Sequence, residues 1–140
     1  MFKLHPQLQQ DCEQLGRFDL CRLLLMRDAN FPWCILVPER VDVVDIHQLT
    51  DEDQQQLTRE SALLSRTMAE VFAADKMNVA ALGNIVPQLH IHHIVRHRDD
   101  LAWPAPVWGK LPARAYPAAE LRTTVERLHA ALGAALHRLQ

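Results

Sequence analysis

The stretch NIVPQLHIHHIVRHRDD, residues 84–100, holds four of the eight histidines of this 140-residue chain. Apolar residues recur at every second position within it, and this alternation predicts a β-strand over residues 87–96. Successive side chains of a strand point to opposite faces of the sheet. Three polar side chains are therefore expected on one face: Gln88, His90 and His92.

The fourth residue of this cluster, His93, falls on the other face, which is otherwise apolar, and we interpret it as a core histidine. Two imidazoles at positions i and i+2 of a strand, such as His90 and His92, can contact one small ligand. Metal coordination needs a third and often a fourth ligand, and no aspartate or cysteine stands at a ligand spacing nearby. A metal site built from all three histidines is thus the less favoured alternative.

Hydrophobic periodicity elsewhere predicts three further strands, at residues 18–28, 33–40 and 76–83. It also predicts a helix over about 51–74, which Thr50 can cap, and a C-terminal helix over about 117–139, which Pro117 opens. The link between the first two strands, residues 29–32, is short enough for a hairpin. Short connections between strands and separately grouped helices favour an α+β class with a mainly antiparallel sheet.

Composition limits the possible classes of protein. The length fits one domain, residues 1–140, and 49% hydrophobic residues, 23% charged residues and a net charge of -2 are typical of a globular chain. This charge balance argues against a nucleic-acid surface, and no apolar run is long enough to span a bilayer. Without a signal-peptide pattern, the three cysteines are expected to be reduced, in a cytoplasmic protein.

The histidine-rich motif resembles the signature of the histidine triad (HIT) family of nucleotide hydrolases and transferases. In that family three histidines stand at alternate positions, separated and followed by apolar residues. The similarity runs from about Phe18 to about Trp108 and includes the ILVP run at residues 35–38. It implies a HIT-like fold, with about five strands, a central helix and a C-terminal helix.

The register of this resemblance follows from two landmarks. Members of the family carry a glycine seven residues before the central histidine and a basic residue six residues after it. Gly83 and Arg96 have this spacing from His90. His90 is then the central histidine, His92 is the third, and Gln88 replaces the first.

The resemblance implies a catalytic role for each position of the motif. His90 would attack the α-phosphorus of a nucleotide and become a nucleotidyl-histidine, with its ring N–H held by the backbone carbonyl of Gln88. His92 would donate to a phosphate oxygen or act as general acid on the leaving group. The Gln88 side chain can donate a hydrogen bond but cannot carry a proton. If it only orients the site and donates a hydrogen bond, Gln88→His is expected to fold normally and to keep or raise the hydrolysis of simple adenylates.

Other positions match family residues that bind substrate. Asn78 and Asn84 stand where the family keeps amides that hold phosphates, and Asp28 stands near its ribose-binding residue. Trp33 replaces a glycine-histidine pair of relatives, and we interpret it as a core residue that could also line the base pocket. Trp108 lies in the proline-rich region that in relatives reaches the active site or the dimer partner.

These features together predict a hydrolase of nucleotide phosphoanhydrides or phosphoramidates, and diadenosine polyphosphates are the first candidate substrates. The expected partners are the nucleotide and a second copy of the chain, without nucleic acid or membrane. No cofactor held by the protein is expected, although the nucleotide could bring a divalent metal. Two alternatives remain open: a nucleotide-binding sensor or scaffold without turnover, and a histidine-based metal-binding module.

Overall fold

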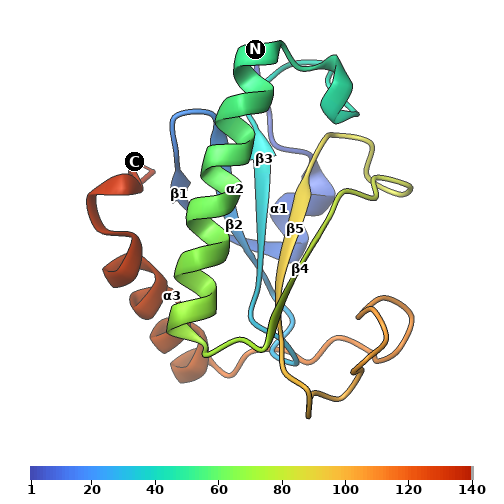
Figure 1. Ribbon diagram of the computed structural model, residues 1–140, viewed down its shortest axis with the longest axis vertical. Coiled ribbons are helices and arrows are strands. Elements are labelled where there is room, and N and C mark those ends of the chain that lie inside the picture. The colour runs from blue at the N-terminus through green and yellow to red at the C-terminus, as the bar shows by residue number, and fades with distance from the viewer. Residues whose placement is uncertain (140) are drawn as a thin grey trace.

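The computed structural model describes residues 1–139 and contains one five-stranded sheet (Figure 1). Its strands are β1 (Cys12–Arg17), β2 (Cys21–Met26), β3 (Trp33–Pro38), β4 (Lys76–Ala80) and β5 (Ile91–Arg96). Its helices are α1 (Pro6–Asp11), α2 (Asp51–Val71) and α3 (Ala118–Leu132), with short 3-10 turns at Ile46–Gln48 and Gly133–Ala135. The strand order is β1-β2-β3-β5-β4 and every pairing is antiparallel, which confirms the predicted α+β class and the number of strands.

Both faces of the sheet are covered, by different parts of the chain. The long helices α2 and α3 lie on one face, and α1 lies behind the sheet in the same view (Figure 1). Leu64, Met68 and Leu128 of the two long helices belong to the core on the first face, whereas Leu8 of α1 belongs to a second core. Consequently all six residues of β5 are buried, and its two faces contact the two different cores.

The predicted strands were longer than the strands of the structure. β5 begins at Ile91, so residues 87–90 precede the strand, and β2, β3 and β4 are each shorter than predicted. β1 was missed because its sequence, CEQLGR, has no apolar alternation. It pairs with β2 at the edge of the sheet, with a register shift at Gly16. A Cβ atom at Gly16 would meet the carbonyl oxygen of His137 at 2.5 Å, which explains the glycine.

The two predicted helices also end earlier than expected. α2 ends at Val71 rather than near residue 74. α3 ends at Leu132 rather than at 139, because Gly133 has a φ of 54° and turns the chain out of the helix. Leu136 then packs into the core as part of an irregular segment, and the backbone of His137 pairs with that of Arg17.

The three cysteines, Cys12, Cys21 and Cys34, are free and buried. Burial raises the pKa of the Cys12 thiol to about 12 and also raises the pKa values of the other two thiols. Their role in the structure is therefore packing. Within residues 1–139, no helix combines the length and the apolar character that a membrane span requires.

Candidate active site

His90 lies immediately before β5, at the end of the loop that follows β4, and it is buried with 7% of its surface exposed. Its Nδ1 is 2.7 Å from the backbone carbonyl oxygen of Gln88. A carbonyl can only accept, so the ring proton must be on Nδ1. The other nitrogen, Nε2, therefore keeps its lone pair, as a nucleophile requires. This is the carbonyl contact that the resemblance implied.

His92 has the opposite arrangement of donor and acceptor. The indole Nε1–H of Trp33 donates to its Nδ1 at 3.0 Å. An indole N–H is only a donor, so neutral His92 must carry its proton on Nε2. Trp33 thus does more than fill the core: it fixes the tautomer of a neighbouring histidine, and the strand register that pairs Ile35 with His92 brings the two together.

Three aromatic rings lie next to the ring of His92. The centroid of its ring is 5.0 Å from those of His90 and Trp108 and 5.6 Å from that of Trp33. Burial, with smaller contributions from His90 and His93, lowers the pKa of His92 to about 3. His92 is consequently neutral near pH 7 and offers a hydrogen bond from Nε2.

His93 points to the other face of β5, as predicted, and is fully buried. Its Nδ1 is 3.0 Å from the backbone oxygen of Ile91, and its Nε2 is 2.7 Å from the hydroxyl of Ser61 on α2. Burial lowers its pKa to about 4. The three histidines therefore do not converge on one point, and residues 1–139 contain no group of three or more histidine, cysteine or acidic side chains placed to hold a metal ion.

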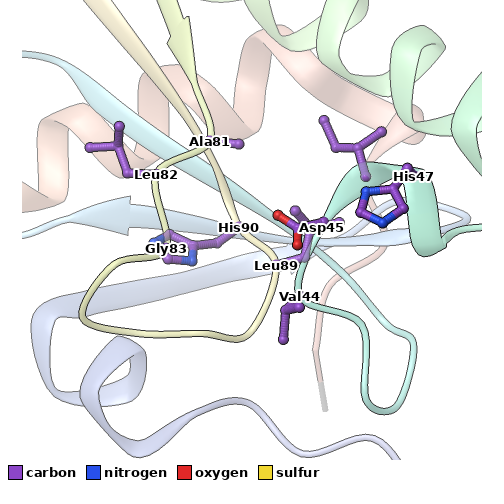
Figure 2. A pocket seen from close by; sticks show the side chains of 9 residues that line it. Val44, Asp45, His47, Ala81, Leu82, Gly83, Leu89 and His90 are labelled. Carbon is purple, nitrogen blue, oxygen red and sulfur yellow. The ribbon is translucent and has the colours of Figure 1, made fainter.

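Two pockets meet at His90. The first, which we call the α1 pocket, has a volume of about 400 Å³ and is bounded by α1, the loop 82–86, His90, His92 and Trp108. Its size is typical of a small-molecule site. The second, which we call the Asp45 pocket, has a volume of about 260 Å³ and lies between residues 44–47 and the loop 81–83. Figure 2 shows His90 beside Gly83 on one side of this pocket, with Asp45 and His47 toward the other.

The structure brings only some of the predicted site residues together. Asn84 lines the α1 pocket with His90 and His92. Asn78 instead accepts a hydrogen bond from the buried Arg96 at 2.8 Å, and Asp28 accepts from the backbone N–H groups of Asn30 and Arg114. Asn78 pairs with Ile94 and Ala80 pairs with His92, so Asn78 shares the face of His92 but lies farther along β4, toward Arg96. Asp28 follows the end of β2 near that same end of the sheet, where Trp33 pairs with Ile94.

Several pocket residues were not identified from the sequence. Gln7 and Asp11 of α1 line the α1 pocket, and Asp45 and His47 line the second one. Pro6 is a signal for a helix start that could have revealed α1. No local pattern shows that α1 packs beside residues more than seventy positions later.

Comparison with known proteins places these features in context. The HIT domain family matches residues 7–99. A histidine triad protein from Marinobacter aquaeolei is 50% identical, with a TM-score of 0.92 over 94% of this chain and 96% of that one. One from Bradyrhizobium japonicum is 43% identical, with a TM-score of 0.90 over 92% and 96%. One from Sinorhizobium meliloti is 42% identical, with a TM-score of 0.91 over 94% and 98%. Among curated proteins, none matches the chain.

Proposed function

Because this chain belongs to the HIT domain family of nucleotide-binding hydrolases and transferases, we propose that it hydrolyses nucleotide phosphoanhydrides through a nucleotidyl-histidine intermediate at His90. One observation carries the proposal: two neighbouring rings have complementary fixed tautomers. His90 presents a lone pair at Nε2, and His92 presents an N–H. A phosphoryl group bound between them would meet a nucleophile and a hydrogen-bond donor at once.

The first step forms a bond from His90 Nε2 to the α-phosphorus and breaks the bond to the leaving group. The imidazole ring becomes cationic as this bond forms. The Gln88 carbonyl, 2.7 Å from Nδ1, accepts a stronger hydrogen bond from the cationic ring and so stabilises the charge. Water then attacks the phosphorus, the bond from Nε2 to phosphorus breaks, and a nucleoside monophosphate leaves. One proton of the water passes to solvent, and neutral His90 is regenerated with its proton on Nδ1.

The low pKa of His92, about 3, bears on the choice of substrate. A neutral imidazole stabilises a phosphate oxygen by hydrogen bonding but is a poor source of a full proton for an amine. A polyphosphate leaves as a stable anion and needs no such proton. Dinucleoside polyphosphates are therefore the first proposed substrates, and adenosine phosphoramidates are second.

The pocket arrangement suits a substrate with two halves. His90 contributes to both pockets, with the larger α1 pocket on one side and the smaller Asp45 pocket on the other. The α1 pocket is large enough for a nucleoside. We assign it to the transferred nucleotide, whose phosphate Asn84 can contact from the loop, and the Asp45 pocket to the leaving group.

A substrate panel tests this function. Purified protein should release AMP from diadenosine polyphosphates, and intact-protein mass spectrometry after acid-free quenching should show a mononucleotide adduct. An adduct that never turns over would instead favour the sensor or scaffold alternative. Absence of both adduct and product across dinucleotides and phosphoramidates would overturn the proposal.

The tautomer argument predicts an effect of Trp33→Phe. The substitution keeps an aromatic ring but removes the N–H that holds His92, so the His92 proton can move to Nδ1. Turnover should fall by about tenfold, the value of one hydrogen bond of roughly 1.4 kcal/mol. Trp108→Phe is the control, because Trp108 packs on His92 without fixing its proton. Equal losses in the two variants would contradict the assigned role of Trp33.

We also propose that the chain forms a homodimer. β4 is an edge strand, and exposed apolar side chains lie on it and on the loop that follows it: Val79, Leu82 and Ile85. An exposed edge with apolar side chains favours association with another copy. Light scattering at micromolar concentration should give twice the mass of one chain, and a monomeric mass would contradict the proposal.

A further inference from the structure

The side chain of Gln88 does not face the phosphate site but holds the N-terminal segment. Its Oε1 accepts a hydrogen bond from the backbone N–H of His5 at 2.9 Å. Its Nε2 donates to the backbone carbonyl of Lys3 at 2.8 Å. Both ends of the amide are thus bound to one stretch of backbone, more than eighty residues away in the sequence.

The chemistry of the amide explains why glutamine occupies this position. The oxygen and nitrogen of a carboxamide project side by side, as an acceptor and a donor, and match the donor and acceptor of an extended backbone. The two nitrogens of imidazole point in divergent directions, so one ring cannot reach both Lys3 and His5. Histidine at position 88 would lose at least one of the two hydrogen bonds.

The segment held by Gln88 leads directly into a wall of the α1 pocket. Leu4 is 4% exposed and packs in the second core. His5 caps α1, since its Nδ1 accepts from the backbone N–H of Gln7. Gln7, like Asp11 at the end of the helix, then lines the pocket. A change in the position of residues 3–5 would therefore move the pocket wall.

We propose that Gln88 is a positioning residue that sets nucleotide affinity by fixing α1 against the pocket, while its backbone carbonyl orients His90. The part concerning affinity rests on the proposed function; the part concerning α1 does not. The two roles belong to different groups of one residue, so a change of side chain can separate them. This revises the expectation for Gln88→His, which should loosen α1 rather than restore a triad.

The first test is Gln88→Met, which keeps the length of the side chain and removes both hydrogen bonds. Hydrogen exchange at the His5 amide and in α1 should become about tenfold faster or more, because two hydrogen bonds are lost. KM for a dinucleoside polyphosphate should rise by about tenfold, with a smaller change in kcat. Gln55→Met, on the exposed face of α2, is the matched control and should leave both quantities unchanged.

A second pair of variants tests the same hydrogen bond, between Gln88 Oε1 and the backbone N–H of His5, by changing His5. His5→Ala removes the cap but keeps the backbone N–H, whereas His5→Pro removes both. The φ of His5, −56°, already suits proline. Exchange in α1 should be faster in His5→Pro than in His5→Ala. In a Gln88→Met background this difference should disappear, since the partner of the N–H is already absent.

The outcomes separate the two proposals. Faster exchange in Gln88→Met supports the anchoring role even if no nucleotide is hydrolysed by the wild type. Unchanged exchange in α1 overturns the anchoring role, whatever the activity. An active enzyme in which Gln88→Met speeds exchange but leaves KM unaltered overturns the link from α1 to affinity.

Discussion

Replacing His90 with alanine should abolish the covalent adduct and lower turnover by about 10⁴-fold or more, as loss of a covalent nucleophile does in other enzymes. His90 lines both pockets, and its Nε2 keeps a free lone pair because the ring proton is on Nδ1. Nucleotide affinity should change far less, because the pocket walls remain. Single-turnover kinetics and intact-protein mass measure the chemical step, and equilibrium titration measures the affinity.

Neighbouring alanine substitutions are the controls for this experiment. His92→Ala should still form the adduct, more slowly, because it removes a donor rather than the nucleophile. His93→Ala should lower stability more than activity, since His93 bonds to Ser61 and Ile91 on the opposite face of β5. An inactive, well-folded His93→Ala together with an adduct in His90→Ala would show that the assignment of the two faces is wrong.

Lowering the pH from 7 to 5 should reduce the free energy of unfolding by about 2–4 kcal/mol, a large effect for a chain of this size. Burial lowers the pKa values of His92 and His93 to about 3 and about 4, from 6.5. Below pH 6.5 the unfolded chain therefore binds protons that the folded chain does not. Each histidine then lowers the stability by about 1.4 kcal/mol per pH unit.

Urea unfolding at several pH values measures this dependence. His93→Gln removes one of the two titrating groups and should reduce the loss between pH 7 and pH 5 by about half. Asp100, whose pKa is lowered to about 2, adds a separate loss only below its ordinary pKa of 3.8, outside this window. Equal stability at pH 7 and pH 5 would refute the burial argument.

Periodicity was sufficient for the elements with regular patterns. The alternation correctly placed His92 and His93 on opposite faces, since the side-chain period of a strand is two. It also brought His90 beside His92, although His90 lies one residue before β5. It failed for β1, an edge strand that exists because β2 offers it hydrogen-bond partners. Periodicity also predicted that the C-terminal helix continues through the leucines beyond Gly133, where α3 has already ended. Apolar residues at helical spacing can be buried by an irregular segment as well as by a helix.

The candidate site was predictable only in part, because some of its residues depend on partners that are distant in the sequence. The motif and the spacing of Gly83 and Arg96 pointed to His90 as the proposed nucleophile, because those relations are local in the sequence. The sequence could not place Asn78 and Asp28, whose hydrogen bonds are to Arg96 and to the backbone at Asn30 and Arg114. Such partners depend on which strand ends lie together.

The sequence by itself determined the α+β class and the placement of His90 beside His92, and its resemblance to the HIT family implied the contact between His90 and the Gln88 carbonyl. The class follows from the periodicity and order of the predicted strands and helices, and the two features of His90 follow from relations between residues two positions apart. Tertiary structure alone decided the tautomer of His92, through Trp33 fifty-nine residues earlier, and the partners of the Gln88 amide. The donor or acceptor role of a polar side chain depends on the group opposite it, and only the packing of distant segments supplies that group.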